Sequence, residues 1–368
     1  MPVPRRFGPR WSRCSRRLLG RLTNAVVLGA ALLPGVAEAG RLDLSLLNLC
    51  QPSAPRGLAG GQASECAWVE RDADGAVSRV VLDPEASSRF RSLMSELGMV
   101  MAPQVVTPAD TIGFAGFQVS AELGLTRISN QERHWDGVKG VSPQNRLADR
   151  PDAWLSTIGV FVKKGIWLPL PSMEVGTGVV HLLQSQLVAY QAYAKLALHE
   201  GFHDWPLPSV ALRAGLSHVT GSAEARLDVA SFDALASKAF GIGGTFRFEP
   251  FGGWSYLLIK AKSGVIDATP ACDGVLSEAG LSGGPGCGPA LPDRDLQANF
   301  SFSDQSTIVR QRFFGGVKLK FASVFVAGQY EYAPPGRSRD DVQVSGGSAA
   351  RDGSGRQDRV TLSGGFDF

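Results

Sequence analysis

The carboxy-terminal stretch RVTLSGGFDF, residues 359–368, decides the fold. Its apolar residues Val360, Leu362, Phe366 and Phe368 stand at alternating positions, with polar residues between them. Successive residues of a β-strand point to opposite faces of a sheet, so this stretch is a strand with one apolar and one polar face. Such a strand can close an antiparallel barrel in a membrane, with its apolar face toward lipid and its polar face toward the lumen. The last strand of a soluble sheet has the same pattern, so the rest of the chain must decide.

The aromatic residue after this alternation resembles the assembly signal of bacterial outer-membrane β-barrel proteins. The resemblance rests on residues 359–368, with Val360, Leu362, Phe366 and Phe368 as the signal. It implies that barrel-assembly machinery inserts the chain into the cell outer membrane, where outer-membrane lipid surrounds it.

Residues 1–39 have the features of a signal peptide for export. Seven arginines precede a short apolar core at 24–34, and Ala37 and Ala39 flank a cleavage point before Gly40. This core is too short to span a bilayer. Without residues 1–39 the chain has 30 basic and 33 acidic residues, which moves the net charge from +3 to about −3. The basic character belongs to the signal peptide, and no nucleic-acid partner is expected.

The four cysteines after the signal peptide form two local pairs, Cys50 with Cys66 and Cys272 with Cys287. In an exported chain such pairs are expected to form disulfides. Neither pair has the C-x-x-C spacing of many metal sites, so we expect no metal and no other cofactor.

Ten segments of membrane-spanning length alternate apolar and polar residues. They lie at 115–126, 154–167, 173–183, 187–199, 209–219, 225–240, 246–256, 307–320, 323–332 and 359–368. The three longest connections follow the first, seventh and ninth segments, so all three lie at the same end of an up-and-down barrel. Outer-membrane barrels carry their long loops outside and their short turns inside. The prediction is an all-β fold, an antiparallel transmembrane up-and-down β-barrel at 109–368 with about ten strands (roughly eight to twelve are possible).

Residues 40–108 differ from the barrel region and are predicted to form a small periplasmic segment. An acidic turn at 72–75 indicates a hairpin, and Asp83 followed by Pro84 can begin a helix. Phe90, Leu93 and Leu97 then give that helix an apolar stripe. The helix could pack on the periplasmic mouth of the barrel or fold back as a plug, and the sequence leaves both open.

Charged residues of both signs share the polar face of the predicted strands. They can form a salt-bridged filling or line a narrow pore with a slight preference for anions. A barrel of about ten strands is close to the size that side chains fill, so a wide channel is not expected. The predicted lumen-facing residues are Glu122, Lys163, Glu174, Lys195, Arg213, Arg247, Glu249, Arg312, Lys318, Lys320 and Glu331.

One stretch, HEGFH at 199–203, matches the H-E-x-x-H pattern of zinc metalloproteases. That pattern requires a helix, and Gly201 within it and Pro206 just after it oppose one. We interpret the match as chance. His134 with Asp136 is the other candidate, because some outer-membrane barrel enzymes combine these residue types near the outer rim.

The sequence therefore favours an integral outer-membrane β-barrel with surface loops and a structural or narrow-pore transport role for small solutes. No enzymatic activity is expected. The alternatives are an outer-membrane barrel enzyme, either a protease or a lipid hydrolase, and a secreted soluble β-protein. The solute, the openness of the lumen and the oligomeric state are left open.

Overall fold

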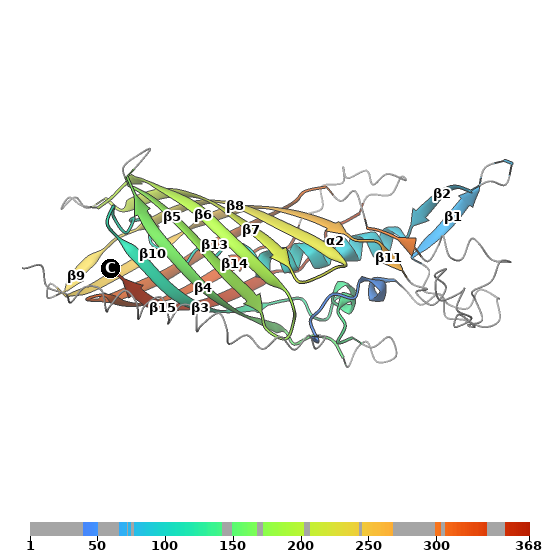
Figure 1. The fold of residues 1–368 in the computed structure, drawn as a ribbon, viewed down its shortest axis with the longest axis horizontal. Helices are drawn as coiled ribbons and strands as arrows, with labels where there is room; N and C mark the ends of the chain where they lie inside the picture. Colours follow the sequence, from blue (N-terminus) through green and yellow to red (C-terminus); the bar gives the residue numbers. More distant parts are fainter. Residues whose placement is uncertain are drawn as a thin grey trace, which may run out of the picture. The chain divides into compact units, whose positions relative to one another are not determined.

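Ten long antiparallel strands of the described residues close into a barrel (Figure 1). Each strand pairs with the next along the chain, and the last pairs back with the first. The all-β barrel predicted from the alternation is therefore confirmed. The strands are β3 (Phe117–Arg127), β4 (Trp154–Ile166), β5 (Met173–Leu182), β6 (Val188–His199), β7 (Ser209–Thr220), β8 (Ala225–Ser237), β10 (Phe246–Ser263), β13 (Ile308–Phe321), β14 (Val324–Ala333) and β15 (Gln357–Asp367).

The structure is a computed structural model of the whole chain. It describes residues 40–50, 66–71, 73–74, 77–141, 149–167, 172–201, 207–242, 245–267, 299–302, 306–336 and 350–368. A short additional strand, β9 (Phe240–Ile242), pairs with the beginning of β10. The short strands β11 (Ile266–Asp267) and β12 (Asn299–Phe300) pair with each other. In the described part of the chain, no helix is long and apolar enough to cross a membrane.

The carboxy-terminal strand closes the barrel. Leu362 pairs with Leu123, and Phe366 pairs with Val119. At the end of the chain, the Phe368 amide donates to the Phe117 carbonyl at 2.8 Å, and the Phe117 amide donates to the Phe368 carbonyl at 3.0 Å. The apolar side chains of β15 point outward and are exposed, as the alternation predicts. Their role as an assembly signal stays a prediction.

The two ends of the barrel differ in their connections. We call the end with Phe117 and Phe368 the terminal end and the opposite one the loop end. Short turns, such as the one between β13 and β14, join strands at the terminal end. The long connections after β3, β10 and β14 all lie at the loop end, as their odd order predicts. The loop end has η2 (Arg133–Gly137), which lies in the connection after β3.

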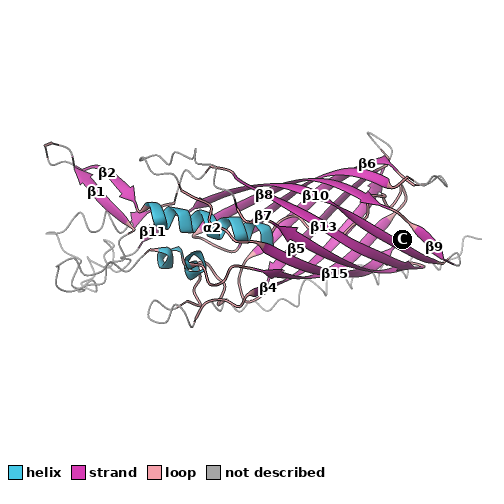
Figure 2. Cartoon of the chain, turned by 180° about the vertical axis from the view of Figure 1, so that it is seen from behind, coloured by secondary structure: helices cyan, strands magenta, loops and turns pink. Residues whose placement is uncertain are grey.

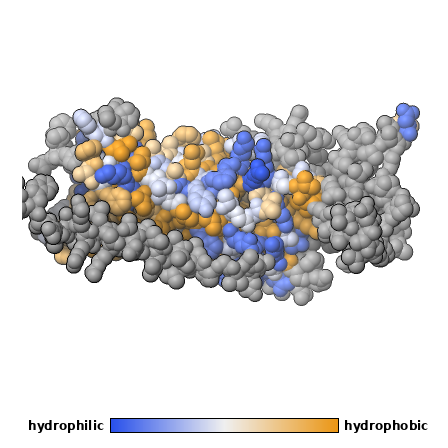
Figure 3. Space-filling view, viewed as in Figure 1, coloured by the Kyte–Doolittle hydropathy of each residue, from blue (hydrophilic) through white to orange (hydrophobic). Residues whose placement is uncertain are grey.

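The barrel wall is apolar outside and polar inside. On β7, for example, Leu212 and Leu216 are exposed while Arg213 and Ser217 are buried. In Figure 3, hydrophobic side chains cover much of the visible wall, and hydrophilic side chains gather toward the end with α2. An apolar exterior around a polar interior is the reverse of a soluble protein and is typical of outer-membrane barrels.

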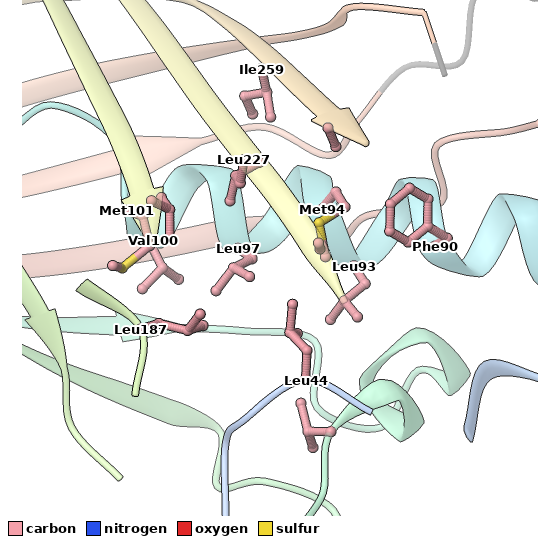
Figure 4. Close-up of a cluster of buried hydrophobic side chains, with 14 of the residues drawn as sticks. Leu44, Phe90, Leu93, Met94, Leu97, Val100, Met101, Leu187, Leu227 and Ile259 are labelled. Carbon is pink, nitrogen blue, oxygen red and sulfur yellow. The ribbon is translucent and has the colours of Figure 1, made fainter. Parts of the chain in front are cut away.

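Helix α2 (Pro84–Val100) lies at the loop end of the barrel (Figure 2). Asp83 caps it by accepting hydrogen bonds from the amides of Glu85 and Ala86, which satisfies two of the free donors of its first turn. Its apolar stripe packs against Leu187, Leu227 and Ile259 of the barrel (Figure 4). A Cβ atom at Gly98 would lie 2.7 Å from the Ile259 Cδ1 atom, so any larger residue here would require the Ile259 side chain to move.

The predicted domain boundary at residue 108 is not a boundary in the structure. Ala39–Phe368 forms one compact unit, because α2 packs at the loop end and residues 101–111 continue inside the barrel. The sequence left open whether the helix packs on the mouth of the barrel or forms a plug. In the structure α2 packs at the loop end, and the buried residues 101–109 that follow it run through the lumen. The helix lies at the end opposite the carboxy-terminus.

The remaining described residues of the amino-terminal region form a hairpin and a short helix. Strands β1 (Ala67–Arg71) and β2 (Val77–Leu82) pair antiparallel around the predicted acidic turn. The helix η1 (Leu46–Leu49) precedes Cys50. The sulfur atoms of Cys50 and Cys66 lie within bonding distance, with their Cα atoms 5.0 Å apart. The predicted partners Cys272 and Cys287 lie outside the described residues.

Candidate functional site

An extended segment runs through the barrel between α2 and β3. We call residues 101–112 the lumen segment. Its residues 101–109 are buried, and it begins near the loop end and leads to β3 at the terminal end. Pro103 and Pro108 have no amide hydrogen, so the segment offers more hydrogen-bond acceptors than donors. A stable arrangement therefore requires donors from the barrel wall.

Basic side chains of the wall provide these donors. Arg312 Nη2 donates to the Pro103 carbonyl at 2.7 Å, and Lys195 Nζ donates to the Pro108 carbonyl at 3.0 Å. Further side chains, including the neutral Gln191, donate to carbonyls from the end of α2 along the lumen: Arg359 to Val100 (3.1 Å), Gln191 to Met101 (3.2 Å) and Ala102 (3.1 Å), Arg213 to Gln104, Lys163 to Val106 (3.4 Å), and Lys195 to Asp110 (2.8 Å).

Acidic side chains balance the buried cations of the wall. Arg312 lies 3.2 Å from the Glu331 carboxylate and 3.7 Å from the Asp233 carboxylate. Lys195 lies 3.2 Å from Glu174. Both basic side chains are 0% exposed, so their charges are stable only with partners of opposite sign. The lumen is thus a salt-bridged polar core built around a segment of the same chain.

Nine of the eleven predicted lumen-facing residues are buried. The other two, Arg247 and Lys320, are partly exposed near the terminal end. Arg247 lies 2.7 Å from Asp110 of the lumen segment, and Lys320 lies 3.0 Å from Asp367. The nine buried residues are Glu122, Lys163, Glu174, Lys195, Arg213, Glu249, Arg312, Lys318 and Glu331.

Sequence reasoning missed three buried charged residues of this core. Arg359 stands on the polar parity of the terminal strand and was available from the alternation. Asp233 lies in the segment with the least regular alternation, 225–240. Arg310 donates to Ser95 at 2.9 Å and so connects β13 to α2. The contact between Arg310 and Ser95 could not be predicted from the sequence, because the two residues are 215 positions apart.

A second polar cluster, centred on Glu96, fastens α2 to the long connections. We call it the Glu96 cluster. The fully buried Glu96 carboxylate accepts hydrogen bonds from Trp135 Nε1 at 2.8 Å and from the Gly355 amide at 2.8 Å. It also accepts from the Ser129 amide at 3.0 Å and contacts His134 Nε2 at 3.1 Å. One carboxylate thus connects α2 with the connection after β3 and the connection after β14.

These contacts set the ionisation of Glu96. Burial raises the pKa of its carboxyl group, but the hydrogen bond and charge of His134, together with Ser129 and Gly355, outweigh burial and hold the pKa at about 2. A pKa below the ordinary value means that the ionised cluster stabilises the folded state above about pH 4.5. As the pH falls from about 4.5 toward 2, roughly 3 kcal/mol of this stabilisation is lost.

We therefore expect α2 to loosen from the loop end under acid. Hydrogen exchange of the α2 amides, measured on the barrel in detergent, should accelerate as the pH falls below about 4.5, after correction for intrinsic exchange. Glu96→Gln should exchange rapidly at neutral pH and show no further acid effect. A control substitution at the exposed Glu85 should leave the pH profile unchanged. An unaltered profile in Glu96→Gln would contradict this role.

The rim pair predicted from the sequence is not brought together. Asp136 Oδ1 accepts from Arg150 Nε at 3.1 Å, whereas His134 turns to Glu96. The His134 Nε2 atom lies 3.4 Å from Ser129 Oγ and 3.1 Å from Glu96 Oε1, so a single ring nitrogen faces both groups. The Ser129 hydroxyl also donates directly to Glu96 Oε1. A serine hydrolase uses two different ring nitrogens for the hydroxyl and the carboxylate. The arrangement is that of a structural hydrogen-bond cluster.

The H-E-x-x-H stretch begins on a strand. His199 ends β6, and Glu200 accepts a hydrogen bond from the Thr111 amide at 2.9 Å and one from Ser172 Oγ at 2.9 Å. The described residues of the stretch, 199–201, are not helical, whereas the zinc motif requires both histidines on one helical turn. His203 lies outside the described residues. Among the described residues, no group of three or more His, Cys, Asp or Glu side chains could hold a metal ion.

No protein-family model and no curated protein matches this sequence. Several solved structures share its fold at low similarity. The translocator domain of the autotransporter NalP from Neisseria meningitidis is 10% identical, with 70% of this chain and 89% of that chain covered and a TM-score of 0.32. Neisserial surface protein A is 11% identical (68% and 95% covered, TM-score 0.25), and the outer membrane protease OmpT from Escherichia coli is 8% identical (71% and 98% covered, TM-score 0.21).

Because all three TM-scores lie below 0.5, the fold assignment stands on the strand pairing of this chain. An even number of antiparallel strands, an apolar outer wall and long connections at one end fit the bacterial outer membrane. A single fold can support many different functions, so a barrel of this kind is compatible with an enzymatic or a structural role.

Proposed function

We propose that this protein is an integral outer-membrane β-barrel that is closed by its own chain and presents its amino-terminal segment at the cell surface. The observation that carries this proposal is the lumen segment, whose carbonyls are bound by Arg312, Lys195 and other wall side chains. A solute would have to displace these buried contacts. They favour the structural role over narrow-pore transport.

The orientation in the membrane follows from the connections. Outer-membrane barrels carry their long loops on the outside, and the three long connections share the loop end. Helix α2 and the Glu96 cluster lie at that same end. The mature amino-terminal segment would then be outside the cell, which replaces the periplasmic location predicted from the sequence. Since β3 begins at the terminal end, the chain must pass through the lumen.

Labelling of single cysteines tests this orientation. Glu85→Cys introduces a thiol on the exposed face of α2, and Thr245→Cys introduces one in the short connection before β10 at the terminal end. A membrane-impermeant maleimide should label Glu85→Cys on intact cells. It should label Thr245→Cys only after the outer membrane is permeabilised. The wild-type protein measures the background from the native cysteines.

Two other results would count against the proposal. If Glu85→Cys reacted only in permeabilised cells, the amino-terminal segment would be periplasmic. If the purified protein stayed in solution without detergent, and migrated identically on gels before and after boiling, it would not be a membrane barrel. The barrel-assembly machinery and outer-membrane lipid would be its partners under the proposal.

A further inference from the structure

Two rows of charged residues cross the outer wall of the barrel near the loop end. In the register of β7, β8 and β10, Lys262 pairs with Arg226, and Lys260 pairs with Asp228. Asp228 pairs on its other side with His218. All five side chains are exposed on the outer face. We call these residues the outer charged rows.

Cations dominate the outer charged rows. The His218 Nδ1 atom lies 2.6 Å from the Asp228 Oδ1 atom, so the single carboxylate of the rows already has a partner. Within the described part of the chain, Arg226, Lys260 and Lys262 make no ion pair or hydrogen bond. Residues two apart on a strand are separated by about 7 Å, and Arg226 stands directly opposite Lys262. Three cationic side chains therefore stand on neighbouring positions of two paired strands.

An apolar groove begins directly below these charges. The next row toward the terminal end is Leu216, Ala230 and Leu258. The small side chains of Ala192 and Ala230 leave a groove of about 610 Å³ between the larger ones. His218, Asp228 and Lys260 line the same groove at its charged edge. One depression therefore combines an apolar floor with a charged rim.

The height of the charged rim fits the surface of a membrane. On β10 the outward residues from Phe248 to Leu258 are apolar or aromatic, except for glycine. At about 3.3 Å per residue and a tilt of about 40°, this stretch spans about 25 Å along the barrel axis, the height of an apolar belt. Lys260 and Lys262 come directly after it, where lipid headgroups begin.

We propose that the groove and the outer charged rows bind a phosphate-bearing lipid of the outer leaflet. The phosphate lies against Lys260, Lys262 and Arg226, and an acyl chain lies in the groove over Ala230. This inference rests on the proposed function for the assignment of the loop end to the outer leaflet. Charge complementarity selects an anionic headgroup, and the groove selects a molecule that carries an acyl chain.

Native mass spectrometry of the detergent-solubilised, full-length mature protein tests the site, with lipid A as the probe. The wild type should retain lipid A, and lipid A stripped of its phosphates should bind much more weakly. Lys260→Gln combined with Lys262→Gln should weaken binding about 30-fold, since each cation near a lipid headgroup contributes about fivefold. Ala230→Phe should fill the groove and weaken binding while leaving the charges in place.

The matched control removes two cations from the terminal end, with Lys164→Gln and Lys238→Gln, and should bind lipid A as the wild type does. Equal losses in the two double variants would mean that only net charge matters, and would overturn the site. Complete displacement of lipid A by inorganic phosphate, or full binding by Ala230→Phe, would overturn the lipid assignment. Binding in detergent does not depend on orientation, so periplasmic labelling of Glu85→Cys would refute the proposed function without affecting this measurement.

Discussion

Removal of residues 40–111 is expected to turn a barrel that passes no ionic current into one that conducts ions. In the full-length protein the lumen segment occupies the interior, and Arg312, Arg213 and Lys195 bind its carbonyls. Without the segment those side chains lose their acceptors, and water must enter to solvate them. A planar bilayer should therefore show no steady current with the full-length mature protein and discrete current steps with the deletion variant.

The current of the deletion variant should be small. A barrel of ten strands is only slightly wider than one that side chains fill completely, and open porins have about sixteen strands. Salt-bridged side chains such as Arg312 and Glu331 would still narrow the path. We expect steps well below those of a general porin under the same salt conditions.

A second deletion provides the matched control. Removing only the hairpin residues 67–82 leaves α2 and the lumen segment in the chain and should leave the barrel silent. Steady current through the full-length protein would contradict closure by the lumen segment. The 40–111 deletion variant could also be folded, as judged by a change of gel mobility on boiling, and still pass no current. The side chains of the barrel wall alone would then close the lumen.

The barrel itself could be predicted because its pattern is local. Each strand carries its own alternation, and the terminal strand shows both faces within residues 359–368. The alternation of long and short connections supported the strand assignment independently. Successive connections of an up-and-down barrel lie at opposite ends, so all the long ones must follow strands of the same parity. Physical requirements of a membrane, an apolar outside and satisfied backbone groups, restrict such a pattern to a closed barrel.

The lumen segment could not be predicted because its structure depends on distant partners. Residues 101–112 have no periodicity, and their conformation follows from donors such as Arg312, which lies 209 positions from Pro103. The position of α2 has the same origin, since Glu96 meets Ser129 and Gly355 only when the barrel is closed. Its apolar stripe indicated a helix with a buried face but not which end of the barrel would bury it.

The substitution Arg312→Met should cost about 3–5 kcal/mol of folding free energy, because it leaves the buried Glu331 carboxylate without its cation. The Arg312 guanidinium is 0% exposed and lies between Glu331 and Asp233, with Ser255 Oγ at 3.0 Å. Urea unfolding of the barrel in detergent, followed by tryptophan fluorescence, should show a lower midpoint with a similar slope.

Comparison with Arg247→Gln separates buried from exposed pairing. Arg247 is also a predicted lumen residue, but its side chain is 44% exposed near the terminal end, so water screens its interactions with Asp110 and Glu249. Its removal should cost less than about 1 kcal/mol. Equal costs for the two variants would mean that the ion pairs of the core do not stabilise this barrel.

A compensated variant then identifies the cause of the Arg312 effect. Combining Arg312→Met with Glu331→Gln removes the carboxylate whose ion pair with Arg312 the first change breaks, whereas Asp233 keeps its ion pair with Arg213 at 3.6 Å. Much of the lost stability should return, because a buried ion pair roughly balances its own desolvation while a lone buried charge does not. If this double variant is no more stable than Arg312→Met, the loss comes from the hydrogen bonds to Pro103 and Ser255. The barrel would then depend on Arg312 as a donor to the lumen segment and not as a counter-charge.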